Sequence, residues 1–152
     1  ALSSIGQYDV AASPLQMAMV AAGIANDGVL MEPYLTKSVR AANLQTVWTH
    51  KDTPMSTPMT RESAKQLQQM MVSVVNNGTG RNARISGVTV GGKTGTAQTS
   101  PDKPPYAWFV GWSDKPKVAV AVFVESSNTE RSEIAGGRLG APIARDVIEA
   151  LR

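Results

Sequence analysis

The sequence contains no cysteine and only one histidine, His50, in 152 residues. These absences exclude disulfides, thiolate catalysis and metal sites built from Cys or from clustered His side chains. We expect neither a metal nor a cofactor. No stretch approaches the roughly 18 consecutive apolar residues of a membrane-spanning helix, and we expect no signal peptide within these residues. We expect any membrane anchor to lie upstream of Ala1.

Long runs of one charge are also absent. The formal net charge is +3 and the pI is about 9.4, but the Lys and Arg residues are scattered along the chain. No run reaches five or six basic residues, so a nucleic-acid partner is not expected. What is present is 42% hydrophobic and 18% charged content, which is typical of one globular domain or a large piece of one. Because the chain opens without Met, we expect a piece of a longer protein.

Three segments carry helix signals. Ser13-Pro14-Leu15-Gln16 reads as a capping box, and the helix that follows to about Asn26 is apolar almost all round, which predicts burial between layers. A second helix is predicted from Thr60 to about Asn76, with apolar residues at i, i+3, i+4 and i+7. A third is predicted from about Pro142 to Leu151. Its apolar residues on one face are Ile143, Val147 and Leu151.

The remaining chain predicts extended structure. Residues 29–58 have short apolar runs broken by prolines, which is typical of extended surface structure. A strand over 88–94 is interrupted by glycines, and this predicts close approach by another backbone or a ligand. The runs 107–112 and 117–123 form a hairpin signal, and the second run is apolar on both faces, so helices should cover both sides of the sheet. The predicted fold class is α/β (α+β), an antiparallel sheet flanked by helices.

The most informative segment is Lys93-Thr94-Gly95-Thr96. Its residue types suit holding a carboxylate beside a carbonyl under attack, because Lys93 supplies a positive charge and the two threonines supply hydroxyl donors. On a strand, Thr94 and Thr96 point to the same face, and Gly95 lets a substrate backbone pair as an added strand. The residue types alone fit a solvated edge strand equally well.

This segment, followed by a strand containing Trp108-Phe109, resembles the third motif of penicillin-binding proteins and serine β-lactamases. The chain before and after it resembles class B transpeptidases, and the actinobacterial penicillin-binding protein A type is one candidate within that class. The resemblance spans nearly the whole chain. The segments that carry it are Ser4-Ile5-Gly6-Gln7, Ser13-Pro14-Leu15-Gln16-Met17-Ala18, Ala25-Asn26-Asp27-Gly28, Ala107-Trp108-Phe109-Val110-Gly111 and Ala141-Pro142-Ile143-Ala144.

The resemblance implies that residues 1–152 are the C-terminal part of a single transpeptidase domain, whose upstream part is a further partner. It implies a peptidoglycan D,D-transpeptidase that cross-links stem peptides through a serine ester, at the extracytoplasmic face of the bacterial plasma membrane. Lys93, Thr94, Gly95 and Thr96 would bind the terminal carboxylate of a stem peptide or of a β-lactam antibiotic. The backbone N–H of Thr96 would form half of the oxyanion hole.

The sequence departs from the family pattern in its serine motifs, and in a minor way at Tyr8, where the family often has glycine. The only literal Ser-x-x-Lys match is Ser100-Pro101-Asp102-Lys103, but it follows the Lys-Thr-Gly strand, and Pro104-Pro105 would end a helix after one turn. Ser126-Ser127-Asn128 matches Ser-x-Asn and also comes too late. We therefore expect the nucleophile and its base upstream of Ala1, and this chain alone to be inactive.

Two alternatives stay open. One is a non-catalytic β-lactam or peptidoglycan sensor that shares the fold. The other is a nucleotide-binding module, because Gly87 to Thr94 fits the Walker A pattern. A polar stretch precedes that match and no helical pattern follows it, which disfavours a phosphate-binding loop.

Overall fold

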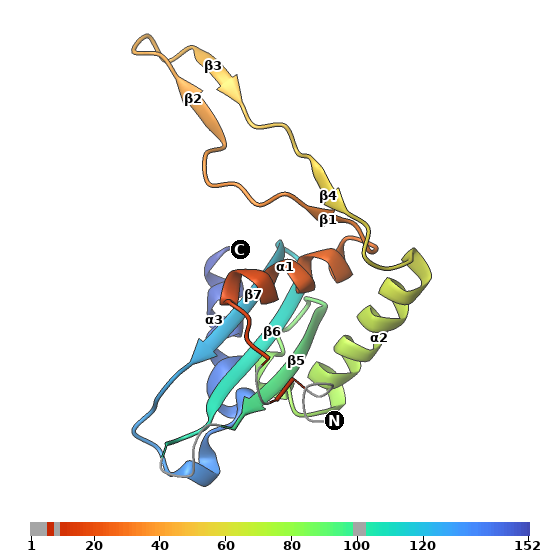
Figure 1. Ribbon diagram of the computed structural model, residues 1–152, viewed down its shortest axis with the longest axis vertical. Helices are drawn as coiled ribbons and strands as arrows, with labels where there is room; N and C mark the ends of the chain where they lie inside the picture. Colours follow the sequence, from red (N-terminus) through yellow and green to blue (C-terminus); the bar gives the residue numbers. More distant parts are fainter. Residues whose placement is uncertain (1–5, 8–9, 99–102) are drawn as a thin grey trace.

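A three-stranded antiparallel sheet lies at the centre of the protein (Figure 1). The structure is a computed structural model that describes residues 6–7, 10–98 and 103–152. The strand order is β5 (Val90–Ala97), β6 (Tyr106–Asp114) and β7 (Lys117–Val124). The predicted hairpin is confirmed in the β6–β7 pair, which closes at Asp114↔Lys117. The glycine-rich strand starts and ends later than predicted, so the whole Lys-Thr-Gly-Thr segment lies inside β5.

The three predicted helices are present as α1 (Pro14–Ala25), α2 (Arg61–Asn77) and α3 (Ala141–Ala150). The capping box of α1 is formed as predicted: Gln16 N donates to Ser13 Oγ at 3.2 Å, and Ser13 N donates to Gln16 Oε1 at 2.8 Å. Helix α2 has Thr60 as its N-cap and stops at Gly78. Shorter helical turns lie at η2 (Arg81–Ala83), η3 (Arg131–Glu133) and η4 (Gly136–Gly140).

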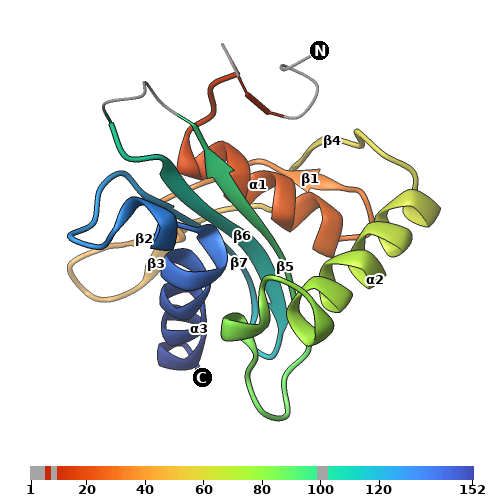
Figure 2. The same ribbon diagram turned by 90° about the horizontal axis from the view of Figure 1, so that it is seen from below.

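Helices cover both faces of the sheet, as the apolar β7 sequence predicts. Figure 2 shows α1 and α3 on opposite sides of it. On the α3 side, Phe109 and Ile148 are fully buried together with Val75 of α2. On the α1 side, Trp112 packs with Ile24 of α1 and with α2. Complete burial of a side chain such as Phe109 stabilises the fold by about 1.5–3 kcal/mol.

The burial of two helices differs from the prediction. Helix α1 is not buried all round, since Leu15 is 59% and Val20 is 48% exposed while only Ala21, Gly23 and Ile24 are buried. One side of the helix packs on the sheet and the opposite side is open. In α3, the predicted apolar face of Ile143, Val147 and Leu151 is exposed. The buried face is made by Ala141, Ala144 and Ile148, because small residues allow the helix to approach the sheet closely.

Gly91 and Gly92, at the start of β5, are required for a different reason from the one predicted. A Cβ on Gly92 would lie 2.3 Å from Cζ of Phe109, and one on Gly91 would lie 2.4 Å from Cε2 of Trp112. These glycines therefore make room for aromatic rings of the same sheet, and the expectation of a ligand or another backbone was wrong at these two positions. A Cβ on Gly95 would meet only Trp108 Cβ, at 3.3 Å, so there is space beside this residue.

Residues 30–56 form an arm that projects from the body (Figure 1). Strands β1 (Leu30–Met31) and β4 (Pro54–Ser56) pair at its base, and β2 (Ser38–Arg40) and β3 (Thr46–Thr49) pair toward its tip. The predicted extended surface structure is thus confirmed. Within the described ranges, no helix combines the length and the apolar character needed to span a bilayer.

Candidate functional site

Strand β5 has one free edge within the described residues. Its other edge pairs with β6 from Val90↔Ser113 to Ala97↔Tyr106, and no second strand of the described part pairs with it. A free edge presents backbone N–H and C=O groups with which a peptide can pair as an added strand. The Lys-Thr-Gly-Thr segment occupies the second half of this edge.

The side chains of the segment point to both faces of the sheet. Lys93 and Gly95 lie opposite Val110 and Trp108 in the register, on the face toward α1. Thr94 and Thr96 alternate with them and share the other face. The prediction that the two threonines share a face is therefore confirmed. The side chain of Lys93 starts on the opposite face, so it can approach the threonines only by passing the free edge of the strand.

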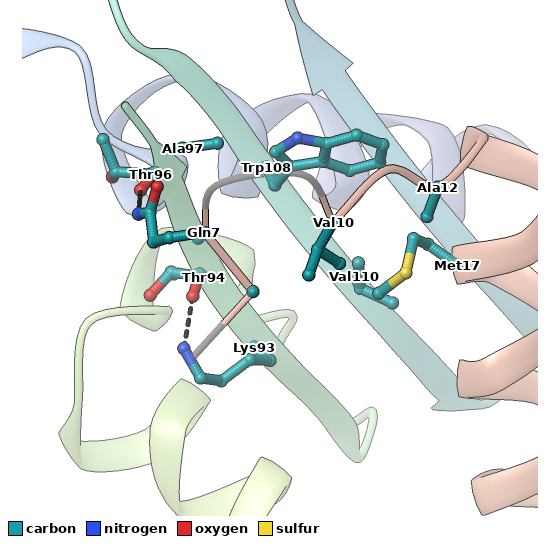
Figure 3. Close-up of a pocket in the computed structure, with 12 residues that line it drawn as sticks. Gln7, Val10, Ala12, Met17, Lys93, Thr94, Thr96, Ala97, Trp108 and Val110 are labelled. Carbon is teal, nitrogen blue, oxygen red and sulfur yellow. Dashed lines mark hydrogen bonds between the residues drawn. The ribbon is translucent and has the colours of Figure 1, made fainter. Parts of the chain in front are cut away.

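A hollow lies on each side of this edge. The hollow toward α1 has a volume of about 310 Å³ and is shown in Figure 3. Its lining includes Gln7, Val10, Met17, Lys93, Trp108 and Val110. The hollow on the other side, of about 410 Å³, is more polar. Its lining includes Thr79, Arg81, Asn82, Thr94, Thr96 and Arg138. The free edge of β5 is thus accessible from both faces.

The hydroxyl of Thr94 is held by a residue that the sequence analysis did not identify. Thr79 follows Gly78, the C-cap of α2, and its Oγ1 lies 2.7 Å from Oγ1 of Thr94, with either atom able to donate. Because the two hydroxyls share one hydrogen bond, each has a proton or a lone pair left for a ligand. The stop signal at Asn77-Gly78 places Thr79 at the end of α2, but it does not indicate which strand that end contacts.

Thr96 has its backbone polar groups on the free edge. In an antiparallel pair, a residue that does not exchange hydrogen bonds with its partner directs both its N–H and its C=O to the other side. The Thr96 carbonyl points outward, because it accepts a hydrogen bond from Nε2 of Gln7 at 3.2 Å. The Thr96 N–H must therefore also point to the free edge. This is the geometry that the predicted oxyanion donor requires.

Lys93 is exposed, and its ammonium group donates to the backbone carbonyl of Thr94. The positive charge is thereby held beside the free edge (Figure 3). In the described part of the chain, no three His, Cys, Asp or Glu side chains are grouped to hold a metal ion.

The structure also tests the competing motifs. Lys93 and Thr94 lie inside β5 and not at the start of a helix, so the Walker A match from Gly87 to Thr94 is rejected because a phosphate loop must open a helix. Ser126-Ser127-Asn128 follows β7 in a loop, as expected of a strand-ending turn. Ser100 of the Ser-x-x-Lys match lies outside the described residues.

These observations indicate the class of protein. Lys-Thr-Gly is a motif of penicillin-binding proteins and serine β-lactamases, and here it lies on the free edge of a helix-covered antiparallel sheet. The family model of the penicillin binding protein transpeptidase domain matches residues 1–149. The chain therefore belongs to the penicillin-binding protein transpeptidase family. The predicted family and fold class are both confirmed.

Relatives with known names support this assignment. The chain is 42% identical over 154 residues to peptidoglycan D,D-transpeptidase PbpA of Mycolicibacterium smegmatis, a match that covers 98% of this chain and 31% of that protein. It is 30% identical to stage V sporulation protein D of Bacillus subtilis, covering 97% and 24% of the two proteins. The crystal structure of PBPA from Mycobacterium tuberculosis matches with a TM-score of 0.87 at 39% identity, over 99% of this chain and 37% of that one. The chain thus spans between 24% and 37% of the length of these relatives.

Proposed function

We propose that this chain is the substrate-binding part of a peptidoglycan D,D-transpeptidase, which cross-links stem peptides by serine acyl transfer. The observation that carries the proposal is the Thr96 backbone, whose N–H points to the free edge of β5 beside Lys93 and the Thr79–Thr94 hydroxyl pair. A donor, a cation and two hydroxyls are thus presented along one strand edge. This combination suits a peptide that has a terminal carboxylate next to the carbonyl under attack.

In the proposed complex, the stem peptide pairs along Lys93 to Thr96 as an added strand. The carboxylate binds to Lys93 and to the hydroxyls of Thr94 and Thr96, and Gly95 leaves space for the peptide backbone. The carbonyl oxygen receives the Thr96 N–H, which stabilises the negative charge that develops during attack. Loss of one such donor typically lowers kcat by a factor of about 10²–10³.

The nucleophile of the proposed reaction is a serine outside these residues, because the Ser-x-x-Lys match in this sequence sits next to Pro104-Pro105. The serine attacks the carbonyl, the terminal amino acid leaves with a proton, and the resulting ester is then attacked by the amine of a second peptide. A β-lactam would acylate the same serine. Structures of penicillin-binding protein A from Mycobacterium tuberculosis are acyl-enzyme complexes with imipenem and with penicillin G. Because the proposed substrate is a cell-wall peptide, we propose that the site lies at the extracytoplasmic face of the bacterial plasma membrane.

The proposal is tested by intact-mass spectrometry after incubation with benzylpenicillin. We expect an adduct in the full-length protein, on a peptide upstream of Ala1, and none on this chain alone. An adduct on Ser100 would mean that the nucleophile lies within these residues. An adduct that forms but is never turned over, by hydrolysis or by an amine acceptor, would support a sensor in place of a transpeptidase.

The role of Lys93 has its own test in the full-length protein. Lys93→Ala should lower the second-order rate of acylation, because the ligand carboxylate loses its cationic partner. Lys65→Ala is a suitable control, since that lysine lies on α2, away from both hollows. Unchanged acylation in Lys93→Ala would remove this residue from its proposed role.

A further inference from the structure

The side chain of Gln7 spans the free edge of β5. Its Nε2 donates to the Thr96 carbonyl at 3.2 Å, and its Oε1 accepts from the Gln98 N–H at 3.3 Å. Gln7 lines the hollow toward α1 and lies beside Thr96 (Figure 3). The proposed catalytic and substrate-binding groups do not include this residue.

The two hydrogen bonds of Gln7 imitate the pairing of a peptide unit. In a parallel ladder, one residue donates its N–H to the residue before its neighbour and accepts from the residue after it. The Gln7 amide makes the same two bonds, to Thr96 and to Gln98, on either side of Ala97. It therefore occupies the place that one residue of an added strand would take.

We propose that Gln7 is a specificity-determining residue that closes the substrate-pairing edge of β5 at Thr96. The Gln98 N–H has a single proton, which Gln7 already uses. The Gln7 amide nitrogen also lies in front of the Thr96 carbonyl, where an added strand would place its own N–H. A ligand whose reacting carbonyl accepts a hydrogen bond from the Thr96 N–H has its next amide N–H near the Thr96 carbonyl. That N–H must therefore compete with Gln7 for the carbonyl. The inference rests on the proposed function of this edge.

Two β-lactams can distinguish a ligand with a further amide from a ligand without one. Penicillin G carries an acylamino group whose N–H would extend toward the Thr96 carbonyl, whereas imipenem carries a hydroxyethyl group and has no such amide. Competition by Gln7 should slow acylation by penicillin G and leave acylation by imipenem unaffected. A purely structural role of Gln7 would change both rates together.

The experiment compares wild type, Gln7→Met and Gln7→Asn in the full-length protein. Methionine retains the length of the side chain and removes both hydrogen bonds, and asparagine keeps the amide but does not reach both partners. Gln45→Met, on the arm, is the matched control. We expect the ratio of the penicillin G acylation rate to the imipenem acylation rate to rise in both Gln7 variants. The rise should be roughly two- to tenfold, which corresponds to the net free energy of one hydrogen bond. The control ratio should stay constant.

Hydrogen exchange supplies an independent measurement. In the unliganded protein, the Gln98 amide should exchange faster in Gln7→Met than in wild type, because its acceptor is lost. An unchanged or lowered ratio, or equal losses with both β-lactams, would overturn the inference. Absence of acylation in wild type by either compound would instead refute the proposed function, so the two failures are distinguishable.

Discussion

Substitution by alanine at two glycines of β5 should have different effects: at Gly92 it should lower the stability of the fold, and at Gly95 it should impair ligand binding. A Cβ on Gly92 would lie 2.3 Å from Cζ and 2.8 Å from Cε2 of Phe109, whose side chain is fully buried. The ring has little room to move, because it belongs to a cluster of buried side chains that includes Val75 and Ile148. Overpacking of this kind costs about 1–3 kcal/mol. Gly92→Ala should therefore destabilise the fold by at least this amount.

Gly95→Ala should leave the fold nearly intact and impair ligand binding. Its Cβ would contact only Trp108 Cβ at 3.3 Å, which a small shift relieves, so we expect a stability loss below about 1 kcal/mol, in the range of mild packing changes. The new methyl group would project from β5 between Lys93 and Ala97, into the hollow toward α1 and beside the proposed substrate strand. A displacement of about 1 Å at a reacting centre costs on the order of 10²-fold in rate.

Chemical denaturation and the rate of acylation by a fluorescent penicillin would together measure both effects. Gly92→Ala should lower the free energy of unfolding and, while it remains folded, acylate at a rate close to that of wild type. Gly95→Ala should show the reverse pattern. The reasoning is refuted if both variants lose stability and acylation in the same proportion, since the two glycines would then have one shared role.

Two further predictions concern hydrogen bonds. Thr79→Val should slow acylation by roughly threefold to tenfold, the worth of one net hydrogen bond, because Thr94 loses its hydroxyl partner; Thr79→Ser should restore the rate, and failure of this rescue would argue against the hydroxyl pair. The pKa of Asp27 is lowered from 3.8 by the hydrogen bond from Gln68 and by the charge of Arg61. The ionised Asp27 carboxylate therefore contributes its full stabilisation of the fold above pH 3.8, the usual pKa of the group. This contribution is lost as the pH falls through the lower pKa of the folded state. Unfolding of Asp27→Asn between pH 2 and 5 should show a shallower pH dependence than wild type, and an equal slope would remove Asp27 from this role.

The local signals in the sequence predicted most of the secondary structure. The capping box at Ser13, the stop at Gly78 and the hairpin from β6 to β7 depend on residues a few positions apart, so the sequence contains the information they need. The Lys-Thr-Gly-Thr motif was placed correctly on a strand, and its threonines share a face as expected. The structure adds that this strand is an edge.

The errors and omissions arise from contacts between distant residues. Gly91 and Gly92 accommodate rings that lie across the sheet, which a strand pattern cannot distinguish from space for a ligand. Gln7 is 89 positions away from Thr96 in the sequence, and no local periodicity connects them. Periodicity also did not indicate which helix face packs inward, since small residues bury the α3 face that carries Ile148 while larger apolar residues remain exposed.

The arm between β1 and β4 is attached to the rest of the protein at a narrow base. The chain leaves near Leu30 and returns at Ser56, its register partner, so both ends of the arm meet at one place. A change in the length of the arm therefore leaves the distance between α1 and α2 unaltered. Leu44, near the tip, is 75% exposed, and the tip offers a position where a label or an affinity sequence can be inserted without disturbing the sheet.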